Sequence, residues 1–158
     1  MFRNLRRFKQ QLTDEECKKV LTEELRGVLS VLGDDDYPYG LPINHWYNPD
    51  NGKIYFHSGR GGHKLDSIAR HNKVSFCVYD QGYRVGDDWA LNIKSVIVFG
   101  RAEIVEDVNE ANYAIRQLCY KFTTDEEAID ADFEKNGPVT VCFAITPEHM
   151  IGKLVNES

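Results

Sequence analysis

Residues 54–66 read IYFHSGRGGHKLD, and this stretch carries the strongest structural signal in the chain. Its first part, residues 54–58, is rich in apolar and aromatic side chains, which is typical of a strand, and it ends at the hydroxyl residue Ser58. Three glycines follow within residues 59–62, and Leu65, Ile68 and Ala69 then recur at helical spacing. The local order is therefore strand, glycine loop, helix.

The glycine loop and the helix start together predict an anion site. Glycines let a ligand approach the backbone closely, and the N-terminus of a helix carries about half a positive charge with free N–H groups. Arg60, His63 and Lys64 add side-chain donors. The loop is not a phosphate-binding Walker A motif, because Leu65 follows Lys64 where that motif needs a hydroxyl. A glycine-rich connection with solvated cations stays open as the alternative.

Six or seven strands are predicted around this segment, mostly joined by hairpins. The Asn51-Gly52 dipeptide is typical of a tight hairpin turn, because it supplies positive φ at little cost. Between two of the strands, residues 81–92 are predicted to form a polar surface loop with an isolated Trp89. The expected strands cover residues 27–32, 39–47, 53–58, 74–79, 93–105, 139–145 and 150–154.

Helices are predicted over residues 13–24, 63–70 and 107–122, with a further one opening at residues 124–127 and ending before Gly137-Pro138. Three of these starts have a capping-box pattern, at Thr13/Glu16, Asp107/Glu110 and Thr124/Glu127. The helices are inserted between hairpins and do not alternate with strands. This order favours a mainly β fold, a closed antiparallel barrel, over a doubly wound parallel sheet.

Length and composition predict one soluble domain over residues 1–158. The chain is 42% apolar with a net charge of −6, and a chain of this size buries roughly 68 to 70% of its unfolded surface. The acidic balance argues against nucleic acid as the main partner. No apolar run approaches the roughly 18 residues of a membrane span, and the N-terminus lacks the apolar core of a signal peptide. Four cysteines without a CxxC spacing indicate a reducing, cytoplasmic setting.

The same segment does not favour a metal site or a serine nucleophile. His57, His63 and Asp66 are metal-ligand types, but alternation along a strand followed by a helix start does not bring three ligands to one point. No metal is therefore expected. Ser58 has histidines nearby but no GxSxG elbow and no orienting acid, which disfavours a serine nucleophile.

An ordered set of short motifs resembles a known family. The set comprises Pro42-Ile43-Asn44, Tyr55-Phe56-His57-Ser58 with Gly62 and Lys64, SVIVFGRA at residues 95–102, and Ile151-Gly152-Lys153. In this order and with these gaps, roughly residues 1–155 resemble the pyridoxamine-5′-phosphate-oxidase-like flavoproteins. Within them the chain looks most similar to the 5-nitroimidazole-resistance group.

The resemblance implies a split β-barrel that binds FMN as a homodimer, with two flavins in clefts between the subunits. By position, Ser58, His63 and Lys64 would hold the FMN phosphate, in agreement with the anion site predicted from the loop. Residues 42–44, namely Pro42, Ile43 and Asn44, would lie beside the isoalloxazine ring, with Ser95 near the same cleft. These roles come from the resemblance and not from the spacing.

His57 matches the histidine of the family's FHS motif and would face the cleft. It is the candidate catalytic residue, for substrate contact or proton donation, because imidazole titrates near neutrality. A histidine that is merely hydrogen-bonded at a strand end is the alternative. The C-terminus, HMIGKLVNES, lacks the arginine and histidine by which pyridoxamine phosphate oxidases hold their substrate, so vitamin B6 oxidation is not expected.

The function expected on these grounds is an FMN-dependent oxidoreductase that reduces a small-molecule acceptor, with a nitroaromatic compound suggested by the resemblance. A flavin-binding or redox-sensing module without turnover is one alternative, and a haem-binding relative on the same barrel is another. No sequence feature separates these three.

Overall fold

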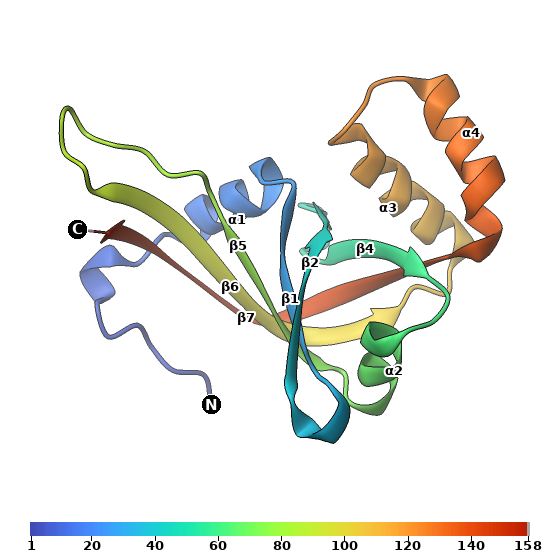
Figure 1. Ribbon diagram of the computed structural model, residues 1–158, viewed down its shortest axis with the longest axis horizontal. Coiled ribbons are helices and arrows are strands. Elements are labelled where there is room, and N and C mark those ends of the chain that lie inside the picture. Colours follow the sequence, from blue (N-terminus) through green and yellow to red (C-terminus); the bar gives the residue numbers. More distant parts are fainter. Residues whose placement is uncertain (158) are drawn as a thin grey trace.

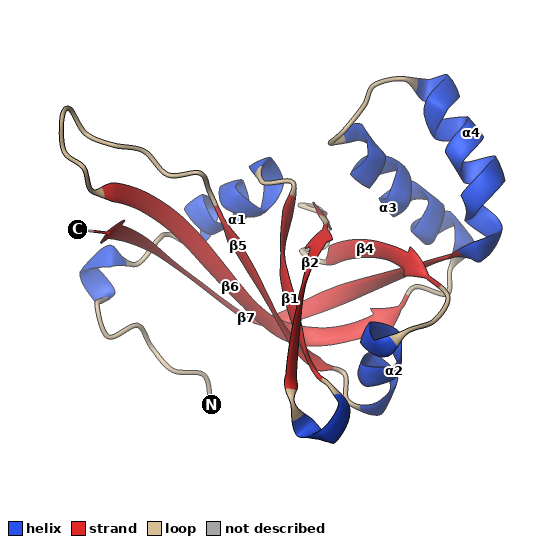
Figure 2. Ribbon diagram, viewed as in Figure 1, coloured by secondary structure: helices blue, strands red, loops and turns tan. Residues whose placement is uncertain are grey.

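Two long strands, β6 (Leu91–Ile104) and β7 (Thr140–Glu157), form the spine of the fold in the computed structural model, which describes residues 1–157. They pair antiparallel from Leu91 opposite Glu157 to Ile104 opposite Phe143. Figures 1 and 2 show both strands crossing the whole molecule and bending strongly. All other strands attach to one side or the other of this pair.

The sheet has seven antiparallel strands in the order β2-β1-β5-β6-β7-β4-β3. The remaining strands are β1 (Arg26–Leu32), β2 (Pro38–Asn44), β3 (Trp46–Tyr47), β4 (Ile54–Gly59) and β5 (Lys73–Tyr79). The sheet curls, yet its two edge strands, β2 and β3, do not pair with each other within residues 1–157. The mainly antiparallel split β-barrel implied by the resemblance is therefore confirmed, and the closed barrel suggested by the order of elements alone is corrected.

Two strand predictions were wrong in their boundaries. The expected strands at residues 139–145 and 150–154 form the single strand β7, because β6 pairs with it almost without interruption. A register shift at Phe99/Gly100 lets Pro147 lie in the ladder opposite Gly100, so the proline does not end the strand. The expected strand at residues 39–47 divides into β2 and β3 at His45, whose side chain turns into the core.

The four helices are α1 (Asp14–Glu23), α2 (His63–Arg70), α3 (Val108–Tyr120) and α4 (Glu126–Asn136). Short 3-10 turns cover Phe8–Gln10, Asp34–Asp36 and Gly137–Val139. In Figure 2, α3 and α4 form a hairpin that stands beside one end of the curled sheet, while α1 lies at the other end. No helix within residues 1–157 is long and apolar enough to cross a membrane.

The predicted caps have mixed outcomes. The capping box of α1 is complete, with Thr13 accepting from the Glu16 N–H and Glu16 accepting from the Thr13 N–H. Asp107 caps α3, but the Glu110 carboxylate accepts the Tyr55 hydroxyl at 2.7 Å and does not return to the cap. The cap of α4 is Asp125, one residue beyond the predicted Thr124.

The core lies on the concave side of the sheet. Leu29, Phe76 and Val98 face each other in register across β1, β5 and β6, and all three are fully buried. Helix α1 covers this side with Cys17, Val20 and Leu21. A smaller apolar cluster of Tyr55, Ala114, Cys142 and Ala144 joins α3 to β4 and β7. This second cluster fixes where the α3–α4 hairpin stands, and therefore shapes the candidate site.

Candidate functional site

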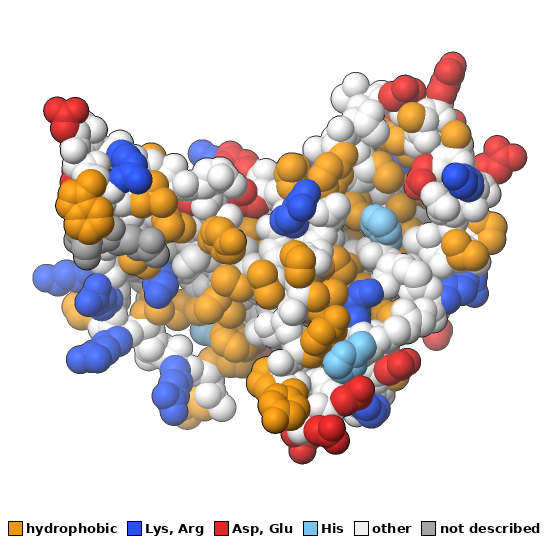
Figure 3. Space-filling view, in the orientation of Figure 1, with side chains coloured by type: hydrophobic (Ala, Val, Ile, Leu, Met, Phe, Trp, Pro, Cys, Tyr) orange, Lys and Arg blue, Asp and Glu red, His pale blue; other side chains and the backbone are white. Residues whose placement is uncertain are grey.

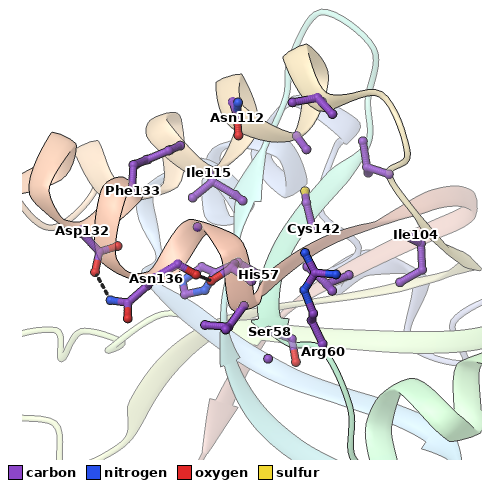
Figure 4. A pocket seen from close by; sticks show the side chains of 18 of the residues that line it. His57, Ser58, Arg60, Ile104, Asn112, Ile115, Asp132, Phe133, Asn136 and Cys142 are labelled. Atoms are coloured by element: carbon purple, nitrogen blue, oxygen red, sulfur yellow. Dashed lines mark hydrogen bonds between the residues drawn. The ribbon is translucent and has the colours of Figure 1, made fainter.

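His57 lies where three hollows meet. It is on β4, opposite Cys142 of β7, and its side chain is exposed although its neighbour Phe56 is buried. The largest of these three hollows, of about 590 Å³, lies between β4, β7 and the α3–α4 hairpin (Figure 4) and is called the α3–α4 pocket below. Smaller hollows of about 200 and 280 Å³ border His57 toward Phe122 and toward Pro42.

The surroundings of His57 keep its imidazole mostly neutral near pH 7. Loss of hydration inside the hollows lowers the pKa of His57 from its ordinary value of 6.5, and the positive charge of Lys64 acts in the same direction. The carboxylate of Asp132 opposes both effects. An anion bound near Lys64 would offset the effect of the lysine and raise the His57 pKa again.

The predicted ring-side residues lie beside His57. Pro42, Ile43 and Asn44 line one hollow together with His57 and Arg26. They form the end of β2, which is an edge strand, so some of their backbone groups have no partner strand on the outer side. The structure therefore brings residues 42–44 and His57 together, although they are on separate strands.

Ser58 and Lys64 also meet. The Lys64 ammonium donates a hydrogen bond to the Ser58 hydroxyl at 2.5 Å, across the glycine loop. Partial burial lowers the pKa of Lys64, and no carboxylate within residues 1–157 forms an ion pair with it. A partly buried cation with only a hydroxyl partner favours an anionic ligand.

The loop geometry fits such a ligand. Gly62 is the N-cap residue of α2 and has a φ of 107°, a backbone conformation that residues with a Cβ rarely adopt. No side chain forms a capping hydrogen bond at this end of the helix. A Cβ built on Gly59, Gly61 or Gly62 would meet nothing within 4 Å. The first N–H groups of α2 thus face open space close to Lys64, as a phosphate-binding helix start requires.

The His63 side chain points elsewhere. Its Nε2 atom accepts the Asp34 N–H at 3.1 Å, and its ring stacks on Tyr39 at 4.2 Å between centroids. The ring is thus held by the turn between β1 and β2 and not by Ser58 and Lys64. The phosphate role of the His63 side chain remains a prediction that this arrangement does not favour, while its backbone N–H belongs to the open first turn of α2.

Ser95 lies far from this site within one chain. It pairs with Lys153 of β7, whereas Ser58 pairs with Val141 of the same strand. Twelve residues of a bent strand separate those two partners, which is roughly 40 Å measured along the strand. Ser95 can approach a flavin held at Ser58 only if a second copy of the chain supplies it, so its role stays a prediction that depends on a dimer.

The three residues weighed as metal ligands do not converge. His63 is held by Asp34 and Tyr39, whereas His57 faces the hollows on the other side of the loop. Within residues 1–157, no group of three or more histidine, cysteine or acidic side chains is close enough to hold a metal ion. The absence of a metal in the purified protein remains a prediction for elemental analysis.

Sequence reasoning missed the contribution of α4 to the site. Asp132 and Asn136, one turn apart on this helix, both line the α3–α4 pocket, and Figure 4 shows them beside His57. The Asn136 amide donates to the Asp132 carboxylate at 2.6 Å. Their spacing of four residues is a sequence signal for one helix face, but it does not show which element that face meets.

The comparisons with known proteins agree with this architecture. Residues 13–154 match the family model described as pyridoxamine 5′-phosphate oxidase. None of the curated proteins is significantly similar in sequence to the chain.

Three solved structures illustrate the range of similar folds. A candidate 5-nitroimidazole antibiotic resistance protein from Bacteroides thetaiotaomicron has a TM-score of 0.79 at 19% identity, covering 92% of this chain and 87% of that one. The flavocytochrome Anf3 from Azotobacter vinelandii has a TM-score of 0.78 at 18% identity, covering 96% and 72%. A FAD-binding protein from Mesorhizobium loti has a TM-score of 0.65 at 25% identity, covering 92% and 97%.

The family predicted from the ordered motifs is therefore confirmed by a match over most of the chain. Because that match runs from residue 13 to residue 154 on a split antiparallel barrel, the chain belongs to the pyridoxamine 5′-phosphate oxidase-like family.

Proposed function

We propose that the protein binds FMN and acts as an oxidoreductase that reduces a small acceptor, such as a nitroaromatic compound. The observation that carries this proposal is the Lys64–Ser58 pair at the open start of α2, directly beside the hollow of His57 and residues 42–44. Names of similar folds, a FAD-binding protein and a flavocytochrome among them, agree with a flavin ligand.

Two parts of the chain would hold the flavin, one at its phosphate and one at its ring. Lys64, Ser58 and the first N–H groups of α2 suit the phosphate, whose charge of nearly −2 satisfies the partly buried ammonium. The end of β2 at Pro42–Asn44 offers unpaired backbone groups to the polar edge of the ring. When bound, the flavin supplies the redox chemistry, and the protein supplies binding and orientation.

His57 is the proposed site of proton transfer or substrate contact. It borders the ring-side hollow and the α3–α4 pocket at once, so an acceptor in that pocket would lie within its reach. The lowered pKa means that the imidazolium fraction grows as the pH falls below 6.5. A proton-donating role therefore implies faster turnover on the acidic side of neutrality.

A homodimer is part of the proposal. On the outer side of the sheet, Val28, Cys77, Ile97 and Ile151 are aligned in register across β1, β5, β6 and β7, and each is half-buried in the single chain. Pro42 extends this row to the edge of the flavin hollow. Figure 3 shows many apolar side chains on one face of the molecule. An apolar row of this kind, continuous with a ligand hollow, favours a second copy as its cover.

Lys64→Ala tests the flavin site. Losing one charge-assisted contact to the phosphate costs about 1.5 to 3 kcal/mol, so FMN binding should weaken roughly ten- to a hundredfold. Riboflavin has no phosphate, and its affinity should change little. Titration of both flavins into flavin-free wild type and variant, followed by fluorescence quenching, measures the double difference.

Lys9→Ala is the matched control, because it removes one exposed lysine from the N-terminal 3-10 turn and should leave both affinities unchanged. Equal losses for FMN and riboflavin in Lys64→Ala would show that Lys64 supports the fold or the ring and that the phosphate lies elsewhere. No loss for either flavin would remove the loop from the site.

The alternatives separate in simple measurements. The absorption spectrum of the purified protein distinguishes flavin from haem. Steady-state oxidation of NADH or NADPH with a nitroaromatic acceptor distinguishes an enzyme from a binding module, for which we expect bound flavin without turnover. Light scattering tests the dimer, and a mass near 18.2 kDa with flavin still bound would contradict the shared-site model.

A further inference from the structure

The α3–α4 pocket has an apolar interior of a size suited to a small ligand. Its volume of about 590 Å³ lies within the range of small-molecule sites. In Figure 4, Ile115 and Phe133 come from the helices, while Ile104 and Cys142 come from the strands. Further apolar lining comes from Val105, Val108, Ala111, Val139 and Val141.

Two cysteines in this lining behave as uncharged, apolar groups. Burial raises the pKa of Cys142 to about 12, and burial also raises the pKa of Cys119. Both thiols therefore stay protonated near neutral pH and add no negative charge to the pocket. The charge of the pocket is set by its polar lining alone.

That polar lining has an excess of negative charge. Arg60 is the one cation among the lining residues, against the two carboxylates Glu106 and Asp132, and His57 is mostly neutral at pH 7. In Figure 4, Arg60 extends into the pocket on the side of Ile104 and Cys142, whereas Asp132 lies at the opposite side of the pocket. Asp132 therefore has no cation beside it among the lining residues.

Asp132 is the carboxylate placed to meet a ligand beside His57. Both residues line the α3–α4 pocket and the smaller hollow next to it, and the negative charge of Asp132 acts to raise the His57 pKa. The side-chain amide nitrogen of Asn136 donates to Asp132, so the side-chain carbonyl oxygen of Asn136 remains available as an acceptor. The α4 side of the pocket thus presents acceptor oxygens and no cation of its own within the lining residues.

We infer that the α3–α4 pocket selects mainly apolar acceptors that are cationic or carry a hydrogen-bond donor, and that it rejects anionic ones, with Asp132 as the specificity-determining residue. This inference deepens the proposed function, on which it rests, by naming the substrate class of the site. A carboxylate or phosphate on the substrate would be repelled by Asp132, whose carboxylate is exposed at the pocket, so we expect a modest effect of charge on affinity.

The test uses three probes with the same nitroaromatic ring: 4-nitrobenzylamine as the cation, 4-nitrobenzyl alcohol as the neutral compound and 4-nitrobenzoate as the anion. Their affinities for the flavin-loaded protein are measured by calorimetry near neutral pH. Flavin-loaded protein is needed because a free phosphate site would itself attract the benzoate. The amine should bind roughly three- to tenfold more tightly than the benzoate, as expected for a partly exposed charge contact.

Asp132→Asn should abolish most of this preference and leave the affinity of the alcohol within about twofold, since an amide oxygen can still accept the Asn136 hydrogen bond. Glu134→Gln is the matched control, because it removes one negative charge from the same helix outside the pocket lining and should keep the preference. The two variants share a helix and a charge change, so fold effects and bulk electrostatics cancel.

Three results would overturn the inference: equal affinities for amine and benzoate in the wild type, the same response in both variants, or probe binding that is lost on flavin loading. The last result would mean that the flavin itself fills the pocket. Failure of the proposed function is a separate outcome, seen as absent flavin uptake. In that case, the amine and the alcohol are titrated into flavin-free Asp132→Asn and Glu134→Gln. This comparison still decides the role of Asp132.

Discussion

His45 and His57 are close in the chain, and the protein uses them in opposite ways. His45 joins β2 to β3 and is fully buried, whereas His57 on β4 is exposed at the junction of three hollows. Loss of hydration is the main cause of the lowered pKa of both residues. The same physical effect therefore acts on a closed region and on an open one.

The closed region uses its histidine as a structural hydrogen-bond donor. The His45 Nε2–H donates to the Leu21 carbonyl at 2.7 Å, and the ring contacts Phe76 edge to face at 5.0 Å. The Nδ1 atom is buried without a hydrogen-bond partner within residues 1–157, so a second proton there would have no acceptor. Lys121 donates to the backbone carbonyls of His45 and Glu24, and its nearby charge also disfavours the imidazolium.

A neutral histidine can take part in chemistry only where a ligand can reach its ring. A ring enclosed by Leu21, Phe76 and the chain around Lys121 cannot reach a ligand, so its pKa shift affects only the free energy of unfolding. A ring bordered by hollows can exchange a proton with whatever occupies them.

Lowering the pH should have the largest effect on the free energy of unfolding, and this effect should come from His45. Burial lowers the pKa of His45 from 6.5 to about 3, so between these values the unfolded chain takes up a proton that the folded chain refuses. The stabilisation is fully present above pH 6.5 and is lost as the pH falls toward 3, by up to about 5 kcal/mol.

Urea unfolding at several pH values, compared between wild type and His45→Gln, isolates this effect, because glutamine can still donate to Leu21 but does not titrate in this range. His57→Asn is the matched variant in the open region. The dependence on pH should flatten strongly in His45→Gln and only slightly in His57→Asn. Parallel curves for wild type and His45→Gln would show that His45 is not neutral in the folded state.

Adding a methyl group should lower the free energy of unfolding more in the closed region than in the open one. This difference should be smaller than the effect of acid. A Cβ on Gly27 would lie 2.5 Å from the Cys77 carbonyl oxygen and 2.7 Å from the Phe76 ring, next to His45, whereas a Cβ on Gly61 would meet nothing within 4 Å. Gly27→Ala should therefore destabilise the protein by about 1 to 3 kcal/mol, and Gly61→Ala by less than about 0.5 kcal/mol. Denaturant midpoints measure both, and equal midpoints would contradict the packing contrast.

The smallest effect on stability is expected from His57→Asn, within about 1 kcal/mol of wild type, because the side chain is exposed. Its effect should appear instead in the pH profile of flavin-dependent reduction. If His57 donates a proton, the wild-type rate rises as the pH falls below 6.5, and the variant lacks this rise. Identical profiles for wild type and variant would remove His57 from proton transfer.

Local chemistry made much of this architecture predictable. The Thr13/Glu16 capping box, the Asn51-Gly52 turn and the strand, glycine loop and helix of residues 54–66 are confirmed, because each depends on groups a few residues apart. The family also followed from motifs in a given order. The roles carried over with it, for Ser58 and Lys64 among others, stay predictions that their contact now supports.

The boundaries that failed were set by partners distant in the chain. Strand β7 continues past Pro147 because one extra residue, Glu148, shifts the register of β7 against β6. The strand expected at residues 39–47 divides because His45 turns into the core. Neither event has a local signal. Pairing and burial with remote segments supplied the free energy in both cases.

The sequence alone therefore indicated most of the helices and strands, the capping box of α1 and the glycine loop before α2, because hydrogen bonds and backbone preferences over a few residues decide such features. Three relations follow only from the three-dimensional arrangement: Ser95 lies far from Ser58 along β7, the His63 ring is held by Asp34, and Asp132 lines the same pocket as His57. These relations depend on how the curled sheet and the α3–α4 hairpin fold back on each other. A hydrophobic pattern records that a face is buried, but it does not record which face it meets.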